Sequence, residues 1–274
     1  MLSTLETMQR PATPIAMGSR PLAAMPRSAT PSASNKGPAN RILAALPAAT
    51  LDRIAANLIP ISLAVGETLY EVGRKSHHVY FPTSAVVSVM CDTADGATTE
   101  VCAVGSDGVL GLAEVLGGDT TVHRAVVLRA GHAYRLDAQL LKRESGLSGV
   151  FLQALLRCSL VMITQAAQTA VCIRHHSMEQ QLCRRLLQLR DHSRSSEFGM
   201  THETIASLLG VRRETITSAA GKLQMDGCIK YSRGRIEILD RCKLEARACE
   251  CYRVIKDATV DLMGVEAPAD ALAA

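Results

Sequence analysis

Short apolar runs, broken by glycine and polar turns, dominate the chain between Ile61 and Asp137. Most of these runs are rich in β-branched residues and end at a turn former, which is typical of strands joined by short connections. Many strands at close intervals predict an antiparallel sandwich or roll. A short helical segment at residues 40–60 precedes them. The predicted strands are Ile61–Val65, Thr68–Val72, Val79–Phe81, Val86–Cys91, Thr98–Val104, Val109–Leu116, Val122–Leu128 and Ala133–Leu136.

After Asp137 the apolar residues follow a helical period. They predict a short helix over Ala138–Glu144, a long helix from about Ser148 to His175, and another over Met178–Asp191. The long helix carries a stripe with the alternating four- and three-residue spacing of a coiled coil, which predicts a parallel homodimer. A stripe that packs within one chain is the alternative. The stripe consists of Leu152, Leu156, Ser159, Ile163, Ala166, Ala170 and Ile173.

The stretch from Met200 to Leu239 has the pattern of two short helices, a tight turn and a small hairpin. Thr201 is the expected N-cap of the first helix, because its hydroxyl can accept a hydrogen bond from a free amide of the first turn. Gly210 is expected to end that helix, since glycine adopts the left-handed conformation at little cost. Together these features predict a winged helix-turn-helix. The remaining elements are a second helix from near Arg212 and strands over Cys228–Tyr231 and Ile236–Leu239.

Polar and cationic side chains gather on the outer face of the second helix and in the hairpin turn. In a DNA major groove, Arg213 would bridge guanine O6 and N7, and Glu214 would accept a hydrogen bond from a cytosine amine. Lys222 and the cations of the turn would hold phosphates without selecting a base. An ordinary solvated surface is the alternative. The candidate DNA-binding residues are Thr201, Arg212, Arg213, Glu214, Thr215, Ser218, Lys222, Arg233 and Arg235.

Charge is distributed unevenly along the 274 residues, whose net charge is +4. Residues 174–253 contain fifteen Lys and Arg against ten Asp and Glu, whereas residues 41–149 contain nine against eleven. Only the C-terminal part therefore has the positive balance expected of a phosphate-binding surface. The sequence has no tryptophan and only 3% aromatic residues. This composition argues against a stacking platform for single-stranded nucleic acid.

Residues 1–39 are rich in proline, serine, threonine and alanine, which predicts a disordered tail. An organellar transit peptide has a similar composition and remains an alternative. Polar side chains interrupt the most apolar stretch, around Val150–Ile173, so no membrane span is expected. Nine cysteines without a signal peptide indicate reduced thiols in a cytoplasm.

Two small groups of potential metal ligands occur in the sequence. Cys172, His175 and His176 lie within about one helical turn of each other, and one residue separates Cys249 from Cys251. Neither group alone supplies enough ligands of defined orientation for a zinc site. We therefore expect no metal and no cofactor.

The order of these parts resembles the Crp–Fnr superfamily of bacterial transcription regulators. The resemblance spans roughly residues 40–239 and is most specific in Ile205-Ala206, Gly210-Val211, Arg213-Glu214-Thr215-Ile216 and Arg233-Gly234. It implies an α+β fold with an antiparallel β-roll of the cyclic-nucleotide-binding type, a long dimerisation helix and a C-terminal winged helix-turn-helix. The implied divisions are a tail at 1–39, a sensor-like β-roll at 40–146, a dimerisation helix at 147–176, a DNA-binding domain at 177–243 and a helical extension and tail at 244–274.

Within this resemblance, the DNA-binding region departs from the family pattern at two positions. The family's Arg-Glu pair contacts bases, which implies that role for Arg213 and Glu214. Ser218 stands where many members have another arginine, and Arg212 stands where serine is usual. The operator sequence is therefore expected to differ from those of better-known relatives.

The sensor region departs further from the pattern. Members that bind cyclic nucleotides use a Gly-Glu pair for the ribose and an Arg before Ser/Thr-Ala for the phosphate. Here Val109 replaces the glutamate, and His123 followed by Arg124 occupies the second motif. The loss of these ionic partners argues against cyclic AMP, although Val109, His123 and Arg124 remain the candidate effector-binding residues. No cysteine precedes Cys91, which argues against the iron–sulfur cluster of oxygen-sensing members.

These features predict a cytoplasmic, homodimeric transcription regulator that binds an inverted-repeat operator in double-stranded DNA, with RNA polymerase as a partner and an unidentified effector. The alternative is a signalling module that responds to a cyclic nucleotide, a metal or redox state and whose winged helix contacts proteins. The sequence contains no nucleophile elbow, phosphate loop or HExxH motif, so catalysis is not expected.

Overall fold

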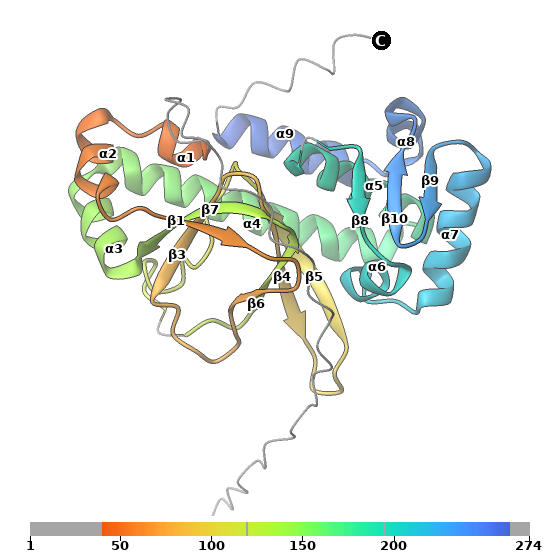
Figure 1. The fold of residues 1–274 in the computed structure, drawn as a ribbon, viewed down its shortest axis with the longest axis horizontal. Coiled ribbons are helices and arrows are strands. Elements are labelled where there is room, and N and C mark those ends of the chain that lie inside the picture. The colour runs from red at the N-terminus through yellow and green to blue at the C-terminus, as the bar shows by residue number, and fades with distance from the viewer. Residues whose placement is uncertain (1–39, 119, 194, 264–274) are drawn as a thin grey trace, which may run out of the picture. The chain divides into compact units, whose positions relative to one another are not determined.

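The computed structural model describes residues 40–118, 120–193 and 195–263. The predicted N-terminal tail at 1–39, with its targeting alternative, and the end of the C-terminal extension at 264–274 lie outside the described residues. In the described part, a short helical segment leads into a block of strands, then a block of helices and a mixed C-terminal unit (Figure 1).

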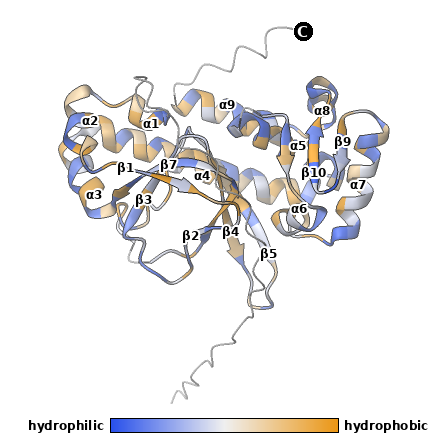
Figure 2. Ribbon diagram, in the orientation of Figure 1, coloured by the Kyte–Doolittle hydropathy of each residue, from blue (hydrophilic) through white to orange (hydrophobic). Residues whose placement is uncertain are grey.

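Two antiparallel sheets form the predicted β-roll. The first has the order β1 (Ile59–Leu63), β7 (Gly131–Asp137) and β3 (His78–Pro82), and the second has the order β2 (Thr68–Tyr70), β6 (Arg124–Arg129), β4 (Val86–Asp92) and β5 (Thr98–Val104). Strand β4 is buried over its first five residues and is strongly hydrophobic in Figure 2. Apolar side chains from both sheets form one core cluster. The antiparallel roll predicted from the sequence is therefore confirmed.

Short helices adjoin the β-roll on either side of it in the chain. They are α1 (Arg41–Ala44) and α2 (Ala48–Ala55) before the strands and α3 (Ala138–Leu147) after them. Asn40 is fully buried and caps α1. Its side-chain amide also donates hydrogen bonds of 2.9 Å to the carbonyls of Pro82 and Gly108, so it joins the start of the described chain to the end of β3 and to the loop after β5.

The segment Val109–Leu116 is not a strand, and this prediction was wrong. Its only strand-like pairing is between Leu110 and Tyr80, whose backbones exchange hydrogen bonds of 2.9 and 3.0 Å. Gly111 then has a φ of +83° and approaches the backbone of His78 closely. The chain therefore turns immediately after the bridge, and the apolar side chains of this segment enter the core from a bend.

The long helix α4 (Gly149–His175) begins where the sequence predicts. The hydroxyl of Ser148 accepts a hydrogen bond from the amide of Phe151. On the inner face of α4, the buried side chain of Gln165 bonds to the amide and the carbonyl of Ala103 in β5, at 3.1 and 3.2 Å. These two bonds to a strand backbone fix the rotation of α4 against the β-roll.

The predicted coiled-coil stripe lies on the outer face of α4. Leu152, Leu156, Ile163 and Ile173 are 37%, 44%, 63% and 49% exposed. The inner face, and not this stripe, packs within the chain. Exposed Leu160 and Val171 widen the stripe beyond the predicted residues. In length and apolar composition α4 could cross a membrane, a test that the core helix of a soluble protein also passes.

Helix α5 (Met178–Ser193) packs against both the β-roll and the C-terminal unit and is buried along its middle. Arg185, 1% exposed, forms an ion pair of 2.5 Å with Glu100 of β5. Near the end of α5, His192 pairs with Asp107 at 3.3 Å. Two charged contacts therefore connect α5 to the β-roll.

The C-terminal unit contains the predicted helix, turn, helix and hairpin. Its elements are β8 (Glu197–Gly199), α6 (His202–Leu209), α7 (Arg213–Met225), β9 (Ile229–Ser232), β10 (Arg235–Ile238), α8 (Arg241–Arg247) and α9 (Cys251–Met263). The strands form an antiparallel sheet in the order β8, β10, β9. Strand β8 was not predicted, because three residues are too few to show a periodic pattern. Helix α9 leaves this unit and packs along α4 (Figure 1).

Candidate nucleic-acid interface

The start and the end of α6 have the geometry that the sequence predicts. The hydroxyl of Thr201 caps the helix by accepting a hydrogen bond of 3.0 Å from the amide of Thr204. Gly210 ends the helix with a φ of +66°. A side chain at this position would also collide with Thr99 of β5. Gly210 is therefore required both for the left-handed backbone and for the close approach of the turn to the β-roll.

Helix α7 presents one buried and one exposed face. Ile216, Ala219, Ala220 and Leu223 are buried and pack in the core of the unit. All of the predicted DNA-binding residues of this region, Arg212, Arg213, Glu214, Thr215, Ser218 and Lys222, are exposed. Among the residues that the structure describes, none of the three cations of this set forms an ion pair. Their charge is therefore available to an outside ligand.

The first turn of α7 offers amide groups as well as side chains. Arg212 occupies the N-cap and makes no side-chain capping hydrogen bond, as its poor capping chemistry predicts. The first amides of α7 thus have no side-chain acceptor and lie next to two exposed guanidinium groups. An oxygen of a DNA phosphate is a suitable acceptor at such a helix start.

The wing turn has an unusual backbone. Arg233 and Gly234 have φ values of +49° and +76°, the combination of a type I′ hairpin turn. A non-glycine residue is strained in this region, so Arg233 occupies the position against its backbone preference. Arg233 is exposed, whereas Arg235 pairs with Glu197 of β8 at 2.9 Å. The sequence treats the two arginines alike. Within the described part of the chain, however, Arg233 has no acidic partner, whereas Arg235 and Glu197 form a surface ion pair between the wing and β8.

His202 connects both helices and the wing, and no pattern in the sequence pointed to it. Its ring stacks on Tyr231 of β9 with centroids 3.9 Å apart, and its Nδ1 lies 3.0 Å from the hydroxyl of Thr217 in α7. Burial, assisted by the charge of Arg213, lowers the pKa of His202 below its ordinary value. His202 therefore links the start of α6 to α7 and to the wing strand β9. These contacts join residues that are distant in sequence, which is why periodicity does not reveal them.

The candidate effector-binding residues have separate structural roles. Val109 is fully buried in the hydrophobic core and has no polar side-chain atom for a ribose hydroxyl. Arg124 pairs with Asp92 across β6 and β4 at 2.6 Å. His123 lies in the turn before β6, where its backbone bonds to the hydroxyl of Thr121. Arg124 is therefore already occupied within the sheet.

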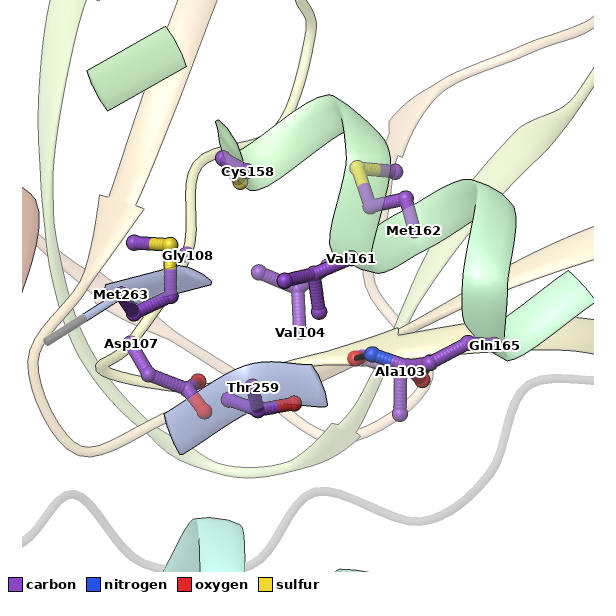
Figure 3. Close-up of a pocket in the computed structure, with 10 residues that line it drawn as sticks. All are labelled: Ala103, Val104, Asp107, Gly108, Cys158, Val161, Met162, Gln165, Thr259 and Met263. Atoms are coloured by element: carbon purple, nitrogen blue, oxygen red, sulfur yellow. Dashed lines mark hydrogen bonds between the residues drawn. The ribbon is translucent and has the colours of Figure 1, made fainter. Parts of the chain in front are cut away.

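A narrow pocket lies next to Gly108, in the segment that resembles the family's first nucleotide motif (Figure 3). Its walls include Asp107, Cys158 of α4, and Thr259 and Met263 of α9. The free volume is about 10 Å³, which is room for about one water molecule. Helix α9 covers one side of this pocket, which is too small to hold a cyclic nucleotide.

Two family profiles match the chain in the order in which the structure places its domains. The profile of the cyclic nucleotide-binding domain matches residues 60–144, and that of the Crp-like helix-turn-helix domain matches residues 180–247. The chain belongs to the Crp–Fnr superfamily. In this Crp–Fnr transcription regulator Arg213 and Glu214 open α7, and α9 lies beyond the residues that match the Crp-like profile.

Solved structures of Crp–Fnr proteins have the same fold. A Crp/Fnr-family protein from Eubacterium rectale is 20% identical, with 74% of this chain and 94% of that chain covered and a TM-score of 0.61. A CRP-family transcriptional regulator from Thermus thermophilus is 20% identical over 69% and 96%, with a TM-score of 0.59. FixK2 from Bradyrhizobium japonicum is 16% identical over 70% and 98%, with a TM-score of 0.61. A comparison with curated proteins gives no significant match.

Proposed function

We propose that this Crp–Fnr regulator binds double-stranded DNA sequence-specifically, with α7 in the major groove. Arg213 donates hydrogen bonds to guanine O6 and N7, and Glu214 accepts one from a cytosine amine. Thr215 and Ser218 offer hydroxyl groups on the same face. The observation that supports this proposal best is the exposed, unpaired polar face of α7, held on a capped helix-turn-helix beside a cationic wing.

Phosphate contacts set the position of α7 in the groove. Arg212 and the free backbone amides of the first turn of α7 face the phosphates of one DNA strand. Lys222 lies on the exposed face further along the helix. Thr201 and Arg233 extend this surface to the start of α6 and to the wing. Arg235 adds positive charge but stays bound to Glu197. Contacts of this kind strengthen binding to every sequence and make it dependent on salt.

A homodimer formed through α4 places two copies of α7 on one operator. The exposed leucines and isoleucines of the outer face of α4 are the apolar surface that such a dimer would bury. A dimer with twofold symmetry recognises an inverted repeat, with half-sites about 34–36 Å apart in successive major grooves. Ser218 stands where many relatives have an arginine, so the base preference should differ from that of those relatives.

The β-roll serves an effector other than cyclic AMP, or a structural role. This part of the proposal is supported by the apolar Val109, the internal pairing of Arg124 and the narrow pocket under α9. If His123 contributes to an effector site, it does so without the arginine and glutamate that hold a cyclic nucleotide in the family. The effector site at Val109, His123 and Arg124 thus remains a prediction.

The protein acts in the cytoplasm, with RNA polymerase as a partner and without catalysis or a membrane. The outer face of α4 is assigned to a second copy and not to lipid, because the inner face of the same helix is hydrogen-bonded to β5. A helix held to a sheet in this way stays with the folded β-roll.

Selection from random duplexes tests the proposal directly. The full chain should enrich an inverted repeat, and gel-shift titrations should show affinity that falls steeply with salt, as expected when several phosphates are neutralised. Enrichment without twofold symmetry would contradict the dimeric arrangement. A complete lack of salt-dependent duplex binding would instead favour the alternative, a signalling module whose winged helix contacts proteins.

A further inference from the structure

Four potential metal ligands from two distant parts of the chain meet where α4 ends. Cys172 lies in the last turn of α4 and His176 directly follows that helix. Cys249 precedes α9, and Cys251 is its first residue. The three thiols are at most 4% exposed, and the side chain of His176 is 12% exposed. One sulfur or nitrogen atom from each residue lies within 4.8 Å of the other three.

The distances match a mononuclear tetrahedral site. The Sγ atoms of Cys172 and Cys249 are 3.5 Å apart, and Sγ of Cys251 is 3.5 Å from Nδ1 of His176. A tetrahedral Zn²⁺ ion, with bonds of about 2.3 Å to sulfur and about 2.0 Å to nitrogen, separates its ligand atoms by roughly 3.5–3.8 Å. In a four-iron cluster each cysteine binds a different iron, so the sulfurs must lie farther apart. The group is therefore compact enough for one ion.

The imidazole of His176 is already oriented for metal binding. Its Nε2 lies 3.2 Å from the carboxylate of Glu250, so that Nδ1 faces the thiol of Cys251. A carboxylate on the second ring nitrogen is the usual support of a metal-binding histidine, because it fixes the ring and strengthens the ligand. The amide of Gln181 also donates to the backbone carbonyl of His176 at 2.9 Å. His175 is exposed and does not belong to the group.

We propose that Cys172, His176, Cys249 and Cys251 bind one Zn²⁺ ion. Three cysteines and one histidine in a closed arrangement are a ligand set of structural zinc sites. Binding of the ion displaces the thiol protons, which pass to solvent as the zinc–sulfur bonds form.

The ion would join the end of the dimerisation helix to the start of α9. It would also hold the junction between α4 and α5, because His176 lies between them. Helix α9 starts after the residues that match the Crp-like profile, so the site would fasten an added segment onto the conserved architecture. Zinc binding at this site does not depend on DNA binding, so each can be tested without the other.

Metal analysis of the full chain tests the site. Protein purified under reducing conditions with Zn²⁺ in the buffer should retain about one zinc per chain after gel filtration. X-ray absorption at the zinc edge should then show a tetrahedral ion with sulfur ligands in excess over nitrogen. Cys249→Ser and His176→Gln should each lower the bound zinc about tenfold or more. Cys242→Ser is the matched control, because Cys242 is exposed and lies outside the group.

A second variant separates zinc binding from general stability. Glu250→Gln keeps the size of the side chain and removes the charge that orients His176. It should weaken zinc affinity about tenfold in competition with a chelator, while the far-ultraviolet circular dichroism stays unchanged.

Several results would overturn the proposal. These are folded wild-type protein without zinc, zinc that survives Cys249→Ser with unchanged coordination, the visible absorption of an iron–sulfur cluster, and a Cys172–Cys249 disulfide in protein handled without oxygen. If the variants do not fold, Co²⁺ titration of the wild-type chain decides the question. Thiolate-to-cobalt charge transfer with tetrahedral d–d bands supports the site, and their absence excludes it.

Discussion

Charged side chains serve opposite purposes in the β-roll and in the DNA-binding unit. In the β-roll, Arg124 is bound to Asp92, and Glu100 is bound to Arg185 of α5. On the outer face of α7, Arg213 is exposed and has no acidic partner among the described residues. A charge that is already paired inside the protein has little left for a ligand, because binding must first break the pair.

The two regions therefore differ in how many of their candidate ligand side chains are left exposed and unpaired among the described residues. In the DNA-binding unit, Arg212, Arg213 and Lys222 are exposed on α7 and have no acidic partner among the described residues. The β-roll retains the fold of a nucleotide-binding domain, while its candidate ligand residues are core, paired or in a turn. The candidate ligand residues of the two regions are therefore placed differently: on α7 they are exposed, and in the β-roll they are buried, paired or in a turn.

A substitution that disrupts the proposed dimer, and so separates the two copies of α7, is expected to change a free energy more than any other variant. Ile163→Glu places a carboxylate in the middle of the proposed dimer interface, twice per dimer. Each buried isoleucine contributes about 1.5–3 kcal/mol, so the dimer should be weakened by about 3–6 kcal/mol. Sedimentation equilibrium measures this change. Val254→Glu, at an exposed position on α9, is the control, and a dimer that tolerates Ile163→Glu would assign the outer face of α4 another role.

Breaking the buried ion pair tests how firmly α5 is attached to the β-roll. Arg185→Met leaves the carboxylate of Glu100 buried without a counter-ion, which should lower the free energy of unfolding by about 3–5 kcal/mol. Urea denaturation measures the loss. Adding Glu100→Leu to the same chain should recover most of it, because no charge then remains buried. Equal stability of the single and double variants would show that the pair is not the source of the effect.

Removing the base-contacting arginine tests the DNA-binding unit alone. Arg213→Ala should cost about 1–3 kcal/mol on the selected operator and relax the preference at one base position. Fluorescence anisotropy on matched and substituted duplexes measures both quantities. Arg233→Ala is the comparison variant, since it should weaken all duplexes alike and reduce the salt slope by about one. Uniform weakening by Arg213→Ala would assign that residue to the phosphates.

The smallest expected change is in the pH dependence of stability, through the His192–Asp107 pair. Although burial of both side chains acts in the opposite direction, the attraction between them raises the pKa of His192 above its ordinary 6.5 and lowers that of Asp107 to about 2. The histidine contributes stability below pH 6.5 and loses it as the pH rises through its raised pKa. The aspartate contributes above pH 3.8 and loses its contribution as the pH falls towards 2.

The pair is therefore fully stabilising between about pH 4 and pH 6.5. In that window His192→Gln should be less stable than the wild type by about 1 kcal/mol, and the difference should shrink as the pH rises through the raised pKa of His192. Thermal unfolding across this range, with the exposed His175 replaced by Gln as the control, measures the trend. A difference that grows with rising pH would contradict the assignment of the charged pair.

Local patterns predict the elements whose signals lie within a few residues. The strand Thr98–Val104 has the predicted bounds, α4 begins next to the predicted Ser148, and Thr201 and Gly210 cap and end α6 as expected. At these helix ends the hydrogen bond or the backbone angle involves residues no more than one helical turn away. The exposed polar face of α7 is predictable for the same reason, because a period of 3.6 residues separates its two sides.

Features made by distant contacts were not predictable. The apolar segment Val109–Leu116 looks like a strand, yet the approach of Gly111 to His78 bends it into the core. The sequence shows two small groups of potential metal ligands, and the path of α9 back along α4 brings members of both together. Nothing near Arg235 in the sequence indicates that Glu197 will neutralise it.

The left-handed backbone of Arg233 makes the wing a compromise between folding and binding. Glycine would occupy this type I′ position without strain. Replacing a left-handed non-glycine residue by glycine removes a conformational strain of about 1–2 kcal/mol. Arg233→Gly should therefore raise the unfolding temperature while it removes a free cation from the DNA-facing surface. If stability alone were selected, glycine would be favoured at this position. An arginine that is kept in spite of the strain is therefore consistent with a benefit in binding DNA phosphates.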